Sequence, residues 1–255
     1  MRSIFAVLTA TMFLAAPAAA QDSPFFVNVN FGFQAQSQDF TQSAEFPLYE
    51  ETGSWAARHS INGGPFFDLG GGMRVPRGPR NLSVGAAYTA RFKHTRNVTV
   101  DVNAPSPIFT DTFRTASGIA SDLEHSEQAL HLQALWLVPV TVEFEVTVFG
   151  GPSFFSVRDE LVESVVPSET GGDFSTVDVG FSTSGQRNST AGFNIGVDTR
   201  YMLMQKFGFI RDLGVGAMLR YSRGSIDLTP IDNGSGGVTI DAGGLEIGAG
   251  LRFRF

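Results

Sequence analysis

The most constraining feature of this sequence is a two-residue alternation of apolar and polar side chains that returns along most of its length. From Phe25 to Gln36, apolar residues occupy every odd position, whereas the even positions after Phe26 are polar or glycine. Successive side chains of a β-strand point to opposite faces, so this pattern predicts a strand with one apolar face. No stretch approaches the roughly 18 uninterrupted apolar residues that a membrane-spanning helix needs.

The alternation recurs in seven further segments, so we predict eight strands. The apolar series of these segments begin at Phe67, Leu82, Leu130, Val142, Phe193, Leu213 and Leu245. An even number of alternating segments separated by turns predicts an all-β fold, an eight-stranded antiparallel up-and-down transmembrane β-barrel. Val238 and Ile240 precede the last series with the opposite parity, and we expect a bulge at Gly243-Gly244 to reset the register there.

The N-terminal residues are typical of an export signal. A basic start at residues 1–3 is followed by an apolar run at residues 4–14 and by small residues at 18–20. This order predicts a secretory signal peptide that is cleaved after Ala20, leaving residues 21–255 as one barrel domain. The absence of cysteine excludes a disulfide scaffold and a thiolate metal site. A net charge of −7 gives no support to nucleic-acid binding.

The connections between the predicted strands alternate in length and charge. Three are short, and four are long, at residues 39–54, 98–126, 159–189 and 224–236. The long ones hold sixteen acidic residues against two basic ones, Arg114 and Arg187. Short turns at one end and long loops at the other are typical of a transmembrane barrel with extracellular loops. The acidic loops suggest loose binding of divalent cations, or bridging through them to lipopolysaccharide phosphates.

Alternation alone leaves open which face of the strands contacts water, because a soluble barrel of the lipocalin type buries its apolar face inside. Aromatic side chains near the strand ends favour the membrane arrangement, since they suit interfacial girdles. These aromatics are Tyr88, Phe92, Trp136, Phe154, Tyr201, Tyr221, Phe253 and Phe255.

The C-terminal segment carries a family resemblance. Leu251-Arg252-Phe253-Arg254-Phe255 has apolar residues at every second position back from a terminal Phe, and it resembles the C-terminal signature of bacterial outer-membrane proteins. With the predicted signal peptide and eight strands, the chain resembles the small OmpA-type outer-membrane barrels, without the periplasmic domain that follows the barrel in OmpA itself. The resemblance implies export to the bacterial outer membrane and contact with outer-membrane lipid and lipopolysaccharide. It also implies that Leu251, Phe253 and Phe255 form a signal for the barrel-assembly machinery. We expect a monomer without cofactor.

An echoed motif predicts the content of the barrel interior. Asp68-x-Gly70-x-Gly72-x-Arg74 recurs as Glu246-x-Gly248-x-Gly250-x-Arg252, with every named position on the inward parity. An eight-stranded barrel is only wide enough for side chains to fill, and charges removed from water must be paired. We therefore expect a lumen ion-pair network of Asp68, Arg74, Arg91, Glu143, Glu145, Asp198, Arg200, Asp212, Arg220, Glu246, Arg252 and Arg254, with Lys93 on the same parity. Such a network either fills and holds the barrel or lines a narrow gated path.

Two histidine–serine clusters are the candidates for catalysis, since some eight-stranded outer-membrane enzymes modify lipid A with a His, a Ser and an acid. The clusters are His59-Ser60 and His125-Ser126-Glu127. Neighbouring residues of a strand face opposite sides, so His and Ser cannot pair within either cluster. A triad needs partners from separate strands, such as His59 with Ser126. The four histidines, which include those at 94 and 131, show no metal-ligand spacing, and we predict neither a catalytic nor a metal site.

The sequence therefore predicts an outer-membrane barrel with a structural or surface-interaction role, long acidic extracellular loops and a charged, plugged lumen. The alternative is a narrow porin-like channel for small polar solutes or ions. A more remote alternative is a lipid A-modifying enzyme.

Overall fold

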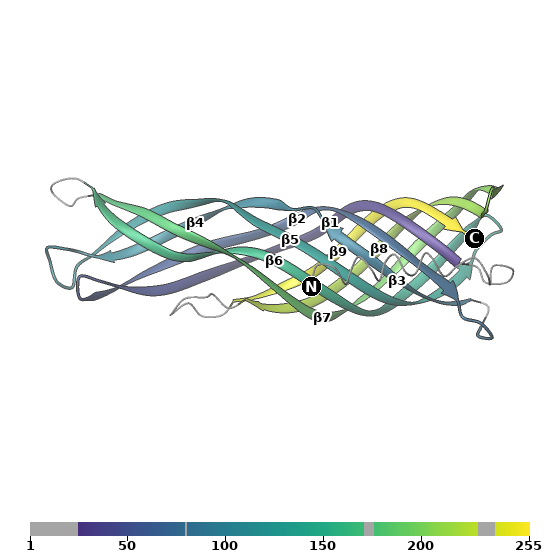
Figure 1. Cartoon of the computed structure of the whole chain (residues 1–255), viewed down its shortest axis with the longest axis horizontal. Helices are drawn as coiled ribbons and strands as arrows, with labels where there is room; N and C mark the ends of the chain where they lie inside the picture. The colour runs from purple at the N-terminus through teal and green to yellow at the C-terminus, as the bar shows by residue number, and fades with distance from the viewer. Residues whose placement is uncertain (1–24, 80, 171–175, 229–237) are drawn as a thin grey trace.

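The computed structural model describes residues 25–79, 81–170, 176–228 and 238–255, and its strands close into a long, narrow antiparallel barrel (Figure 1). The strands are β1 (Phe25–Leu48), β2 (Glu51–Arg74), β3 (Leu82–Arg91), β4 (His94–Pro105), β5 (Phe113–Pro139), β6 (Phe144–Thr170), β7 (Thr176–Phe207), β8 (Ile210–Leu228) and β9 (Val238–Arg254). Within these ranges, no helix is long and apolar enough to cross a membrane. The predicted signal peptide lies outside the described residues.

Hydrogen-bonded neighbours close the ring in the order β1, β9, β8, β7, β6, β5, then β3 and β4 together, then β2, which pairs with β1 again. β3 and β4 share one position because each pairs with both β2 and β5. The predicted eight-stranded barrel is therefore confirmed, with its third strand interrupted at residues 92–93. The ladder from β2 to this strand stops at Phe66–Arg91 and resumes at Arg58–Thr99.

The strands are much longer than a membrane requires, with 24 residues in β1, 27 in β6 and 32 in β7. A transmembrane strand needs only about 9–11 residues. The prediction of long loops is therefore wrong for three of the four, because most residues of 39–54, 98–126 and 159–189 continue the strands. The connections described at this end are short, at residues 49–50 and 106–112. Residues 229–237, which hold most of the fourth predicted loop, lie outside the described part.

The long strands carry two regions of opposite polarity. We call residues 25–35, 65–74, 82–92, 128–138, 144–154, 191–203, 213–221 and 245–255 the belt, and residues 37–60, 94–105, 113–126, 156–170, 176–190, 222–228 and 238–242 the extension. In the belt, Phe31 and Phe33 point outward with 60% and 54% of their surface exposed, whereas Asn30 is buried inside. In the extension the arrangement is inverted, since Val98 is buried inside and Thr99 is exposed.

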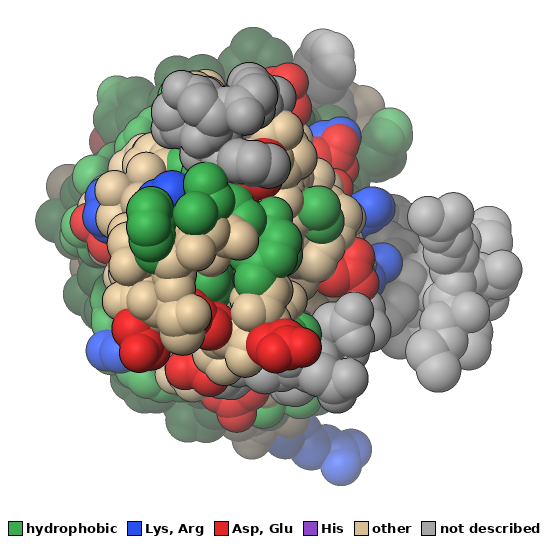
Figure 2. Space-filling view, turned by 90° about the vertical axis from the view of Figure 1, so that its left-hand side faces the viewer, with side chains coloured by type: hydrophobic (Ala, Val, Ile, Leu, Met, Phe, Trp, Pro, Cys, Tyr) green, Lys and Arg blue, Asp and Glu red, His purple; other side chains and the backbone are tan. Residues whose placement is uncertain are grey.

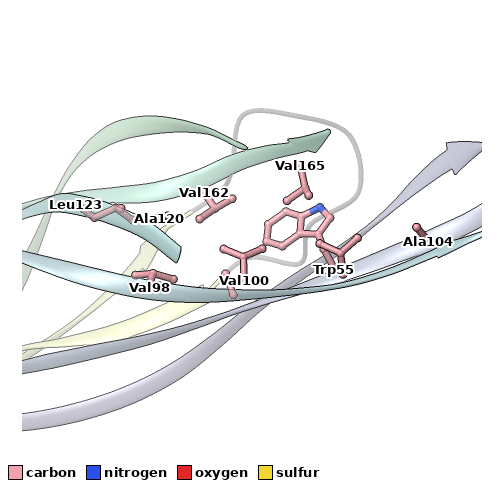
Figure 3. Close-up of a cluster of buried hydrophobic side chains, with 10 residues drawn as sticks. Trp55, Val98, Val100, Ala104, Ala120, Leu123, Val162 and Val165 are labelled. Atoms are coloured by element: carbon pink, nitrogen blue, oxygen red, sulfur yellow. The ribbon is translucent and has the colours of Figure 1, made fainter. Parts of the chain in front are cut away.

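The interior of the extension is a hydrophobic core. One cluster of buried side chains around Trp55 fills its outer part, and a second cluster around Ile61 fills its inner part and reaches the boundary with the belt. The labelled side chains of the first cluster converge from several strands (Figure 3), and they are Trp55, Val98, Val100, Ala104, Ala120, Leu123, Val162 and Val165. Packing of this kind replaces the membrane as the environment that buries apolar surface.

The inversion also corrects the expected bulge at Gly243-Gly244. β8 and β9 pair in one unbroken register from Asp212–Arg254 to Leu228–Val238, so no register reset occurs between these strands. Even-numbered residues of β9 face inward on both sides of the two glycines. Val238 and Ile240 have the opposite parity because the interior at their height is apolar. Along β9 the barrel interior changes from polar to apolar, whereas the even-numbered residues face inward throughout.

Candidate functional site

The centre of the belt interior is a polar cluster around Arg220, whose side chain is fully buried. Its Nε donates a hydrogen bond to Glu246 over 2.9 Å, and one terminal nitrogen lies 3.0 Å from Asp68. The same guanidinium donates to Thr89, which in turn donates to Asp68 over 2.9 Å. Asn30 donates a further hydrogen bond of 2.9 Å to Asp68. One arginine thus connects two carboxylates across the barrel, as required for charges held out of water.

A second group of ion pairs lies toward the chain termini. The pairs are Arg252 with Asp198, Arg200 with both Glu145 and Asp212, and Arg254 with Glu145. Arg252 Nε lies 2.9 Å from Asp198, and a terminal nitrogen of Arg200 lies 2.9 Å from Glu145. A small cavity of about 60 Å³ opens among these groups and is bordered by Asn28 and Arg74. This end of the interior is therefore polar and holds the largest share of the predicted lumen charges.

A third group lies at the outer edge of the belt and includes Glu127, which is absent from the predicted set. Arg91 lies 3.9 Å from Glu127 and donates a 3.1 Å hydrogen bond to Gln36. The backbone N–H of Gly243 donates to Glu127 over 2.6 Å, and Gln34 donates to the same carboxylate over 3.3 Å. Gly243 has a φ of +91°, a conformation that favours glycine. Gly243, where we expected a bulge, therefore donates a backbone hydrogen bond to the buried carboxylate of Glu127.

Ten of the twelve predicted network residues take part in these described ion pairs, namely Asp68, Arg91, Glu145, Asp198, Arg200, Asp212, Arg220, Glu246, Arg252 and Arg254. Arg74 lines the cavity instead. The prediction that Glu143 belongs to the lumen network is wrong, because Glu143 lies exposed in the turn before β6, outside the barrel wall. Lys93 is also misassigned, since it lies in the interruption between β3 and β4 and pairs with Glu124 in a half-exposed position.

The extension contains a buried polar cluster that the sequence reasoning missed. Arg96 contacts Asp159 through two nitrogens at 2.7 and 2.9 Å, and it lies 3.2 Å from His59 Nδ1. His125 Nδ1 lies 3.1 Å from the same carboxylate. His94 on β4 is directly opposite His125 on β5, and their ring centres are 5.2 Å apart. The sequence predicts a loop at Asp159, whereas the alternation of Phe155, Val157 and Leu161 indicates the strand that the structure shows.

The electrostatic setting of this cluster keeps its imidazoles neutral. Burial and the adjacent Arg96 lower the pKa of His59 to about 4, against a smaller opposing effect of Asp159. Burial, with Arg91 as the next contribution, lowers the pKa of His94 to about 4 as well. Burial also lowers the pKa of His125, although Asp159 opposes the change. At neutral pH these side chains are therefore uncharged.

The two histidine–serine clusters do not provide a Ser–His pair. His59 and His125 point into the barrel and are buried, whereas Ser60 is exposed on the outer face. Ser126 alternates with His125 and faces away from it. The described Ser–His contact is elsewhere, at 2.7 Å between the hydroxyl of Ser153 and Nδ1 of His131, and both residues are fully buried.

The far end of the extension exposes apolar side chains, and we call Tyr49, Ile108, Phe109 and Phe113 the tip patch. Their exposed fractions are 47%, 58%, 65% and 45%. Figure 2 looks onto this end and shows hydrophobic side chains with acidic ones around them. At the opposite end of the barrel, Leu251 and Phe255 point outward, and the Phe255 N–H donates to the Phe25 carbonyl over 2.9 Å.

A closed antiparallel barrel with an outward apolar belt and a polar interior defines a transmembrane β-barrel of the outer-membrane class. The chain matches the family described as outer membrane protein beta-barrel domain over residues 6–253, and it belongs to this family. It is therefore a protein of the bacterial outer membrane. No curated protein matches the chain.

Solved structures similar to this chain include several outer-membrane proteins. OprG from Pseudomonas aeruginosa is 14% identical, with a TM-score of 0.43 and coverage of 91% of this chain and 96% of OprG. Ail of Yersinia pestis is 9% identical in its complex with a heparin analogue, with a TM-score of 0.35 and coverage of 90% and 99%. Neisserial surface protein A is 13% identical, with a TM-score of 0.35 and coverage of 91% and 97%.

Proposed function

We propose that this outer-membrane barrel has a structural or surface-interaction role, in which the extension holds the tip patch away from the membrane. The observation that carries the proposal is the apolar filling of the extension by the clusters around Trp55 and Ile61. Protein interiors packed in this way are rigid. Exposed apolar groups with a polar rim are typical of interaction sites, and Ile108 and Phe109 at the tip patch fit that description.

The same filling supports a plugged lumen rather than a narrow channel, because the polar interior of the belt is followed outward by a hydrophobic core. We propose no catalytic role, and the position of Ser60 on the opposite face of the wall from His59 and His125 supports this. As partners we propose outer-membrane lipid and lipopolysaccharide around the belt. We further propose that the barrel-assembly machinery recognises Leu251, Phe253 and Phe255, and that the barrel is monomeric.

Single-channel recording in a planar bilayer separates the first two functions. We expect no steady openings from refolded protein whose barrel is verified by heat-dependent gel mobility. Steady openings whose conductance changes in Arg74→Ala and Arg252→Ala would replace the proposal with a polar channel. A defined mass shift of lipid A on expression would favour the enzyme instead.

A tip variant tests the surface role directly. In Ile108→Ser combined with Phe109→Ser, we expect attachment of expressing cells to protein-coated surfaces to fall several-fold, because the exposed apolar groups are removed. The matched control is Thr99→Ala, which changes an exposed side chain in the wall of the extension. Equal attachment of the tip variant and the control would contradict the proposal.

A further inference from the structure

His94 and His125 form the strongest unexplained feature of the interior. They are direct cross-strand neighbours on β4 and β5. His125 is only 2% exposed. Its Nε2 is buried without a hydrogen-bond partner, and so are both ring nitrogens of His94. These buried ring nitrogens on two adjacent imidazoles contact no other polar group of the described chain, so they are available as ligand atoms.

From this juxtaposition we propose that His94 and His125 bind one divalent transition-metal ion, with zinc or copper as the chemical class that imidazole ligands favour. Imidazole nitrogen suits Zn²⁺, Cu²⁺ and Ni²⁺, and copper binds such sites most tightly in the Irving–Williams order.

The spacing of the two rings fits a shared ion. With Zn–N bonds of about 2.0–2.1 Å at a tetrahedral angle, two imidazoles on one ion have ring centres roughly 5 Å apart. The observed separation is 5.2 Å. Two neighbouring strands therefore already hold the rings at the distance that chelation requires.

The surroundings of His125 match the usual support for a metal-bound histidine. Such a ligand donates its second ring N–H to a carboxylate, which fixes the tautomer and directs the other nitrogen to the metal. Here Nδ1 of His125 lies 3.1 Å from Asp159, and this contact leaves Nε2 as the acceptor. Asp159 is itself held by Arg96 at 2.7 and 2.9 Å.

Two arginines, Arg91 and Arg96, lie near both imidazoles and disfavour a positive charge there. Each arginine has a carboxylate partner that offsets part of this effect, because Arg96 is paired with Asp159 and Arg91 lies 3.9 Å from Glu127. Within the described ranges, no three His, Asp or Glu side chains converge as a complete metal centre. The ion would therefore take two protein nitrogens and complete its coordination with water.

Isothermal titration of the untagged, refolded barrel in detergent with ZnCl₂ and CuCl₂ tests the site. We expect one ion per barrel. His94→Gln and His125→Gln should each weaken binding at least tenfold, and Asp159→Asn should weaken it by roughly 10–100-fold. His131→Gln is the matched control, because His131 is buried without a second histidine beside it.

A spectroscopic readout distinguishes specific ligation from other binding. In the Cu²⁺ complex of the folded protein, electron paramagnetic resonance should show coupling to two nitrogens, reduced to one in His94→Gln. His94→Gln is the safer variant, since its side chain is less buried than that of His125. No stoichiometric binding, or binding equal in His94→Gln and His131→Gln, would overturn the proposal.

Discussion

The belt and the extension use the same eight strands with opposite polarity. In the belt, Ile247 faces lipid with 57% of its surface exposed, while Arg220 is fully buried inside. In the extension, Leu161 is buried inside and Arg58 lies outside. Apolar side chains face whatever excludes water, which is lipid around the belt and the packed interior of the extension. The comparison shows that the alternation of apolar and polar residues specifies a strand. Which of the two faces is apolar depends on whether lipid lies outside the barrel wall or a packed core lies inside it.

Removal of a central belt charge should have the largest effect. Arg220→Ala leaves Asp68 and Glu246 buried without their partner, and loss of one partner of a buried pair costs about 3–5 kcal/mol. Urea unfolding of the refolded barrel measures this loss. The control is Arg223→Ala on the same strand, where the pair with Asp241 is exposed to water and contributes little to stability. Equal losses would show that the interior of the belt is not isolated from water.

Truncation of a side chain in the core of the extension should have the next-largest effect on stability. Leu161→Ala removes a side chain that is 1% exposed in the second cluster, and such changes cost about 2–5 kcal/mol. Val166→Ala on the same strand, where Val166 is 61% exposed, should stay within about 0.5 kcal/mol. Protease resistance of the extension reports both variants. A variant Leu161→Ala that is as resistant as Val166→Ala would contradict a packed interior.

Acid should loosen the extension more than the belt, and this is the smallest expected effect. His59 and His94 have folded-state pKa values of about 4, against 6.5 for the free side chain. The unfolded extension therefore binds more protons between these values, so stability present above pH 6.5 is lost as the pH falls toward 4. Hydrogen exchange at pH 7 and pH 5, corrected for the intrinsic rate, measures amides of both regions. His59→Gln should reduce the difference, and an unchanged difference would argue against His59 as a contributor.

The belt could be predicted from sequence because its outward face is apolar and its inward positions are mostly polar or glycine, apart from one inward cluster of Phe66, Leu135, Phe149 and Met218. Phe25 to Ala35 shows this plainly, and the inward parity of Arg220 and Glu246 follows from it. The extension was missed because its acidic residues suggested loops. Asp39 and Glu45 are in fact the outward members of a strand whose inward members are Phe40 and Phe46.

The contacts between distant residues could not be predicted, since they depend on strand register and tilt. Asp159 meets Arg96 and His125 only because β6 pairs with β5, and β5 with β4, in one particular alignment. Glu143 shows the opposite error, because parity says nothing about where a strand ends. Its position one residue before β6 leaves it in a turn.

The unbroken register of β8 and β9 has a consequence for the evolution of the barrel. Because the backbone of this hairpin passes from belt to extension without a register shift, the level at which its outward face changes from apolar to polar is set by its side chains alone. Exchanging the character of two adjacent residues on both strands would move this level by one step of the pleat. The hairpin could therefore change its depth in a bilayer through substitutions, without inserting or deleting any residue.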